Sequence, residues 1–109
     1  MKSVYLAIQC ADCGDILISR AHHDFNCCSC GLKEGKGIYI DGNSIVSTED
    51  TNSNTKSYYI RMGGDHTKMK SFHVTIPMTP GEIYQDWNKR INKLAKIDPT
   101  IYNLEEIKG

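Results

Sequence analysis

Two closely spaced pairs of cysteines near the start of the chain constrain its fold more than any other feature. Each pair is followed by a glycine, and the four residues are Cys10, Cys13, Cys28 and Cys30. Two short turns that each present two sulfur atoms can close a tetrahedron around one metal ion, and Zn²⁺ favours such thiolate sites. Because four sulfurs leave no coordination position open, the predicted role of the metal is structural.

A fifth cysteine, Cys27, leaves the ligand set open. Cys27 and Cys30 repeat the C-x-x-C-G spacing of the first pair, whereas Cys28 and Cys30 form a shorter turn that is also sterically feasible. His22 and His23 lie close enough in the sequence to replace a sulfur. A disulfide framework is the alternative, but five cysteines without a secretory signal argue against it.

The region around these cysteines resembles a family of small zinc-ribbon proteins of phages and low-GC Gram-positive bacteria. The family pattern is C-x-x-C-G-D-I, then H-D-F, then C-x-C-G, then a strand that ends in D-G; it corresponds to residues 10–16, 23–25, 28–31 and 38–42. Alignment on the H-D-F motif makes Cys28 the ligand and Cys27 an extra thiol. The chain departs from the pattern at 32–37 and 43–57, and its C-terminal part lies outside the resemblance.

The size and charge of the chain bound its organisation. It has 109 residues, with 13 basic and 13 acidic side chains. We expect a single domain, 1–109, with a zinc ribbon at 1–42, a sheet or hairpin at 43–78 and a helical part at 79–109. Residues 47–57 contain no apolar side chain and predict a mobile loop. No apolar run is long enough to cross a membrane, so we expect a cytoplasmic protein. The resemblance to phage proteins implies that this is the cytoplasm of the host bacterial cell.

Alternating apolar residues predict an antiparallel sheet in the first two thirds of the chain. Val4, Leu6 and Ile8 predict one apolar strand face, and Phe72, Val74 and Ile76 predict another. Shorter strands are expected at 16–18, 38–40 and 58–62.

The C-terminal part has a helical period instead. Thr79-Pro80-Gly81-Glu82 predicts a helix start with a capping box. An apolar stripe follows and predicts an amphipathic helix that packs on the sheet; its residues are Ile83, Trp87, Ile91 and Leu94. The predicted fold class is therefore α+β: an N-terminal zinc ribbon with a small antiparallel sheet, packed by a C-terminal amphipathic helix.

No arrangement of nucleophile, base and orienting acid is visible in the sequence, so we expect no enzymatic activity. The resemblance implies a phage protein that binds a host defence protein, most specifically a type II anti-CRISPR that blocks target-DNA loading by the Cas nuclease. Zero net charge favours contact with the nuclease over imitation of DNA. The alternative is a nucleic-acid-binding ribbon with a basic face flanked by Tyr58 and Tyr59; its cations would be Arg61, Lys68, Lys70, Lys89, Arg90, Lys93 and Lys96.

Overall fold

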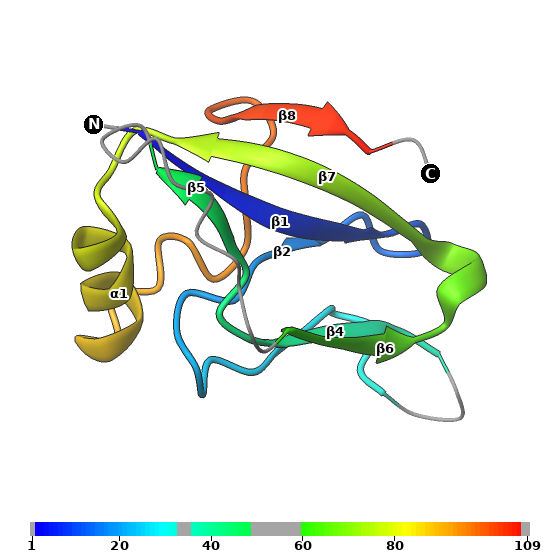
Figure 1. Ribbon diagram of the computed structural model, residues 1–109. Coiled ribbons are helices and arrows are strands. Elements are labelled where there is room, and N and C mark those ends of the chain that lie inside the picture. The colour runs from blue at the N-terminus through cyan, green and yellow to red at the C-terminus, as the bar shows by residue number, and fades with distance from the viewer. Residues whose placement is uncertain (1, 33–35, 49–59, 108–109) are drawn as a thin grey trace.

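The computed structural model describes residues 2–32, 36–48 and 60–107, and these form two antiparallel sheets with one short α-helix (Figure 1). The larger sheet has five strands, and the smaller has three. Within the described residues, no helix is long and apolar enough to cross a membrane.

The long strand β1 organises the five-stranded sheet. One of its edges pairs along its whole length with β7, which pairs in turn with β8. Its other edge is shared, because β5 pairs with the start of β1 and β2 pairs with its end. The strand bounds are β1 Ser3–Cys10, β2 Ile16–Leu17, β5 Ile45–Thr48, β7 Met69–Ile76 and β8 Asn103–Glu106.

The three-stranded sheet has the order β3-β4-β6. Its strands are β3 Asn26–Cys27, β4 Ile38–Gly42 and β6 Ile60–Gly64. The chain enters this sheet after β2 and leaves it between β4 and β5. It returns at β6 and leaves again toward β7 through a 3₁₀ turn at His66–Lys68. The two sheets are therefore interleaved in the sequence and cannot fold as separate N- and C-terminal units.

Two apolar clusters form the interior. The first lies between the five-stranded sheet and the C-terminal segments, and it contains Tyr5, Ala7, Ile16, Ile18, Ile45, Val74, Ile76, Ile83, Leu94 and Ile97. The second lies between the two sheets, and it contains Ile8, Cys10, Leu17, Cys28, Ile38 and Ile40. Two of the four predicted metal ligands thus belong to an apolar cluster.

The buried face of β1 differs from the predicted one. Of the predicted face, Ile8 is buried, but Val4 and Leu6 are only half-buried, whereas Tyr5 and Ala7 of the opposite face are buried. Both faces of this strand carry apolar side chains, so alternation alone does not identify the inner face. On β7 the prediction holds better, because Val74 and Ile76 are fully buried.

The predicted α+β class with a packed C-terminal amphipathic helix is wrong. The only described α-helix, α1, spans Pro80–Asn88, and the segment after it adds strand β8 to the sheet. Of the predicted stripe, Ile83 is buried in α1, whereas Ile91 lies beyond the helix and is 51% exposed. Leu94 is buried, but from a loop. The domain is therefore a small, mainly antiparallel β-sheet structure.

The start of α1 is the predicted one, and its end has a specific cause. The Thr79 hydroxyl accepts a hydrogen bond from the Glu82 backbone N–H at 3.1 Å, which confirms the capping box. After Asn88 the backbone turns, since Arg90 and Asn92 have φ angles of 54° and 59°. Left-handed residues cannot continue a right-handed helix.

Asp86 captures the chain that leaves α1. Its carbonyl oxygen accepts hydrogen bonds from the N–H groups of Ile91 and Asn92. Its carboxylate accepts two more, from Lys93 at 3.0 Å and from Leu94 at 2.8 Å. These bonds hold residues 91–94 as a compact turn, and they insert Leu94 into the first apolar cluster.

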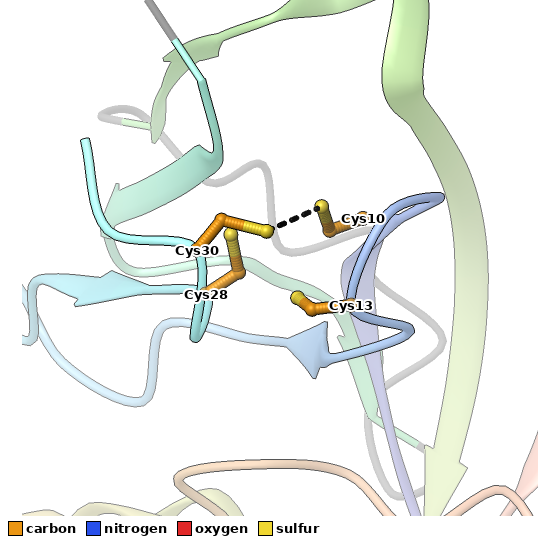
Figure 2. A group of neighbouring side chains, drawn as sticks. All are labelled: Cys10, Cys13, Cys28 and Cys30. Atoms are coloured by element: carbon orange, nitrogen blue, oxygen red, sulfur yellow. Dashed lines mark hydrogen bonds between the residues drawn. The ribbon is translucent and has the colours of Figure 1, made fainter. Parts of the chain in front are cut away.

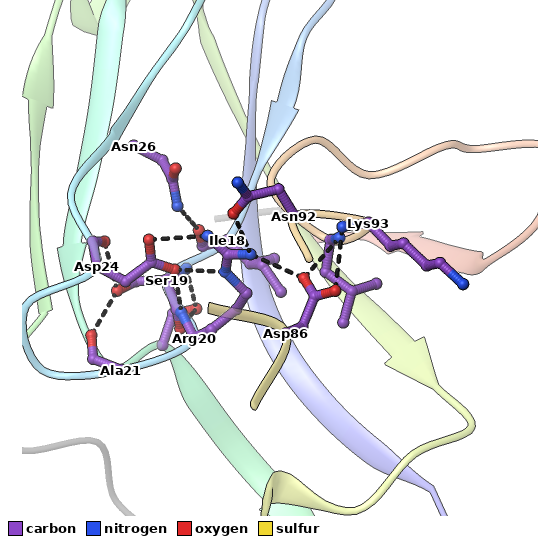
Figure 3. Close-up of polar contacts among 11 residues, drawn as sticks. Ile18, Ser19, Arg20, Ala21, Asp24, Asn26, Asp86, Asn92 and Lys93 are labelled. Carbon is purple, nitrogen blue, oxygen red and sulfur yellow. Dashed lines mark hydrogen bonds and ion pairs between the residues drawn. The ribbon is translucent and has the colours of Figure 1, made fainter. Parts of the chain in front are cut away.

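The same carboxylate belongs to a buried ion network (Figure 3). Arg20 donates from Nε to Asp24 at 2.7 Å and from Nη1 to Asp86 at 2.7 Å. These three residues are at most 5% exposed. The guanidinium therefore ties the segment between β2 and β3 to the end of α1, across 66 residues of sequence.

Two other predictions depend on residues that the structure does not describe. Residues 49–57 of the predicted mobile loop lie outside the described ranges, and Ser47 belongs to β5. Tyr58 and Tyr59, the predicted stacking residues, also lie outside them.

We predict that Ile83→Ala lowers the free energy of unfolding by about 2–5 kcal/mol, because it leaves a cavity in the first apolar cluster. Ile91→Ala serves as the matched control and should change this free energy by less than about 0.5 kcal/mol, because Ile91 is exposed. Urea denaturation measures both values. Equal losses of unfolding free energy for the two variants would instead favour one continuous amphipathic helix that buries both side chains.

We further predict that Asp86→Ala costs about 3–5 kcal/mol, because Arg20 then loses a buried partner and two N–H groups lose their acceptor. Lys68→Ala breaks an exposed pair with Asp12, at 3.7 Å, and should cost less than about 1 kcal/mol. Chemical denaturation of both variants provides the comparison. A loss below 1 kcal/mol for Asp86→Ala would contradict the structural role of the network.

Candidate metal centre

Four cysteine side chains converge where the two sheets approach each other (Figure 2). Cys10 is the last residue of β1, and Cys13 follows in the turn toward β2. Cys28 comes directly after β3, and Cys30 lies in the next turn. Their Sγ atoms all lie within 4.8 Å of one another, and those of Cys10 and Cys30 are 3.8 Å apart. The structure thus brings together the four cysteines named from the sequence.

Two tight turns aim these sulfurs at a common point. In the first, the Gly14 N–H donates to the Cys10 carbonyl oxygen at 2.8 Å; in the second, the Gly31 N–H donates to that of Cys28 at 3.1 Å. Gly14 and Gly31 have φ angles of 78° and 70°. Glycine adopts this left-handed conformation without the steric cost of a Cβ atom, which explains why a glycine follows each pair.

The structure separates Cys27 from Cys28. Cys27 pairs with Tyr39 in the β3–β4 ladder and is exposed. Cys28 is buried, and its Sγ accepts a hydrogen bond from the Ile38 backbone N–H at 3.3 Å. Successive side chains on an extended segment point to opposite faces, so only one of two adjacent cysteines can face the cluster. The geometry therefore favours a ligand set that contains Cys28 over the set with Cys27, which the C-x-x-C-G spacing favours.

The two histidines considered as substitutes for sulfur do not join the cluster. His22 and His23 are exposed, and their rings contact each other edge to face with centroids 5.3 Å apart. Among the described residues, the cysteine group is the one whose ligand atoms are close enough to share a metal ion.

The two cysteine turns are also joined by side chains around them. The Asp15 carboxylate accepts a hydrogen bond from the Ser29 backbone N–H at 2.7 Å. Lys96 contacts the same carboxylate at 3.1 Å, and it donates to the Ser29 hydroxyl at 2.8 Å. The first turn, the second turn and the C-terminal loop are thus connected beside the sulfurs. Such contacts fix the orientation of ligand-bearing turns.

The surroundings of the cluster shift the pKa values of three of its thiols in different directions. Burial raises the pKa of Cys10, and a hydrogen bond to Cys13 raises the pKa of Cys30 to about 12. Burial also raises the pKa of Cys13, but hydrogen bonds from the Asp15 backbone N–H and the neighbouring thiols outweigh it, and this pKa is lowered. Loss of the thiol proton is thus favoured at Cys13 and opposed at Cys10 and Cys30. A bound metal ion would displace those protons and supply a compensating positive charge.

Sequence reasoning missed the side chains that surround the cluster. Asp15, Ser29 and Lys96 come from three segments, and nothing in the local sequence links them. The sequence alone places Lys96 only among the cations of a possible basic face.

One family model matches the part of the chain that contains the cysteines. Residues 4–46 match the model of a domain of unknown function, DUF7695. The match includes both cysteine pairs and the segment that carries Arg20 and Asp24. No curated protein and no solved structure matches the chain.

We predict that Cys28→Ser abolishes stoichiometric metal binding, whereas Cys27→Ser retains one metal ion per chain. The Cys28 variant should also lose roughly 10 °C or more in its thermal midpoint, because structural zinc sites contribute about 10–16 kcal/mol of apparent binding free energy. Elemental analysis and thermal unfolding after reconstitution with Zn²⁺ measure the two quantities. The reverse pattern would show that Cys27 is the ligand.

Proposed function

We propose that this chain is a zinc-stabilised, non-enzymatic protein that acts by binding another protein. The observation that carries the proposal is the convergence of four cysteine Sγ atoms within 4.8 Å of one another. Zn²⁺ suits this donor set because it prefers thiolates and tetrahedral coordination. Cys10, Cys13, Cys28 and Cys30 would hold the ion.

The proposed metal would stabilise structure rather than perform chemistry. A catalytic zinc ion keeps a position open for water or substrate, whereas four protein sulfurs fill the coordination sphere. The cluster lies between β1 of one sheet and the β3–β4 region of the other, so the ion would connect the two sheets. This arrangement suits a small domain that presents a rigid surface to a partner.

The partner that we propose is a host defence protein, specifically a type II Cas nuclease. Support comes from the sequence resemblance to phage zinc-ribbon proteins, quoted above, and from a formal net charge of zero. A neutral protein is better suited to contact the nuclease itself than to imitate the DNA that the nuclease binds. In this proposal the chain would hinder the loading of target DNA.

A continuous basic face for nucleic acid is the weaker alternative. Of the seven cations considered for it, Lys68 forms an ion pair with Asp12 at 3.7 Å, and Lys96 pairs with Asp15 at 3.1 Å. Acidic partners reduce the positive potential that phosphate binding requires. This observation favours the protein-binding proposal.

The experiment is a DNA-cleavage assay with a reconstituted type II Cas nuclease and guide RNA. We expect dose-dependent loss of cleavage when the metal-loaded protein is added before the target DNA. Cys10→Ser should abolish the inhibition because it removes a metal ligand, whereas Cys27→Ser should retain it.

Full cleavage at saturating metal-loaded protein would overturn the Cas-nuclease proposal. Inhibition that persists in Cys10→Ser, despite loss of its metal, would instead contradict the role of the metal centre.

A further inference from the structure

A hollow lies between the loop that joins β2 to β3 and the end of α1. It is lined by His23, Trp87, Asn88 and Arg90, and its volume is about 260 Å³. A second hollow of about 280 Å³ adjoins it through His23, and it is also lined by His22, Asp41 and Arg61. Each hollow alone is slightly smaller than most small-ligand sites, which span roughly 300–1,000 Å³. Both hollows are separate from the cysteine cluster.

The buried ion network holds the two walls of the first hollow in place. His23 directly precedes Asp24, and Trp87 directly follows Asp86. Both of those carboxylates bind the Arg20 guanidinium at 2.7 Å. A buried ion pair is a costly way to gain stability, because both charges lose their hydration. What the network does provide is a fixed spacing between two segments that are far apart in the sequence.

The backbone also fixes the position of Arg90. Its φ angle is 54°, and its N–H donates to the Trp87 carbonyl oxygen at 3.1 Å. Trp87 contacts Tyr84 edge to face, with ring centroids 5.5 Å apart. The Trp87 ring is therefore held by a side-chain contact, and the backbone of Arg90 is fixed beside it, before a ligand arrives.

The lining combines three kinds of recognition group. Trp87 offers an aromatic surface for stacking, and Arg90 is suited to bidentate binding of phosphate. In the adjoining hollow, Asp41 Oδ1 is buried and, among the described side chains, lacks a hydrogen-bond partner. A buried acceptor without a partner is costly unless a ligand or water donates to it. An amino or hydroxyl group on the ligand would satisfy this acceptor.

We propose that these adjoining hollows form a nucleotide-binding site. The base stacks on Trp87, the phosphate binds Arg90, and an amino or ribose hydroxyl group donates to Asp41. The same chemistry occurs in a free nucleotide and in one residue of a single-stranded nucleic acid. The site would bind one nucleotide and does not need an extended basic face on the protein. Such binding goes beyond the proposed protein-binding function.

The test uses Trp87, which is the chain's one tryptophan, as an intrinsic probe. Full-length, metal-loaded protein is titrated with adenosine monophosphate, adenosine, inorganic phosphate and a single-stranded adenine oligonucleotide. Adenosine monophosphate should quench the fluorescence, and adenosine should bind about tenfold more weakly because it lacks the charged phosphate. Tighter binding of the oligonucleotide than of the monophosphate identifies single strands as the source, and the opposite order identifies the free nucleotide.

Arg90→Asn should weaken binding of adenosine monophosphate by about tenfold or more. Asparagine tolerates the left-handed backbone at this position, so the variant should fold. Lys93→Asn removes the same charge from an exposed residue outside both hollows and should leave binding within about twofold of wild type. Retained circular dichroism spectra check the folding of both variants.

Absence of quenching by all four compounds at millimolar concentration would overturn the proposal. Equal weakening by Arg90→Asn and Lys93→Asn would also overturn it, because binding would then follow net charge rather than this site.

Discussion

The meeting of four cysteines between two sheets is the constraint on which the rest of the structure depends. Cys10 ends the long central strand of one sheet, and Cys28 follows a strand of the other. Both belong to the apolar cluster between the sheets. A metal ion held by four thiolates would connect these sheets with bonds stronger than those that so small a core supplies. The glycine after each cysteine pair permits the two turns that this convergence requires.

The buried ion network around Arg20 forms a second connection. Arg20 follows β2 and binds both Asp24 and Asp86, which fixes the end of α1 against the cysteine-containing region. The proposed metal would hold sheet to sheet, whereas the ion network holds helix to loop. The first connection would stabilise the domain. The second explains why two distant segments form the walls of one hollow.

Local patterns in the sequence predicted local structure well and distant contacts poorly. The capping box at Thr79 and the clustering of the cysteine pairs depend on short spacings, so both could be recognised. The end of α1 could not, because Asp86 binds the N–H groups of the following turn. The ion network was also missed, since Arg20 and Asp86 are 66 residues apart. The pairing of β8 with β7 depends on tertiary packing, whereas the sequence pattern of that part of the chain predicts helix.

The most direct test of the metal centre is X-ray absorption at the zinc edge of the reconstituted protein. The structure predicts four sulfur neighbours at about 2.3 Å and no nitrogen or oxygen ligand. This result would establish the closed site from which a structural role follows. A shell that contains nitrogen or oxygen would show that histidine or water completes the coordination, and it would contradict a closed four-cysteine centre.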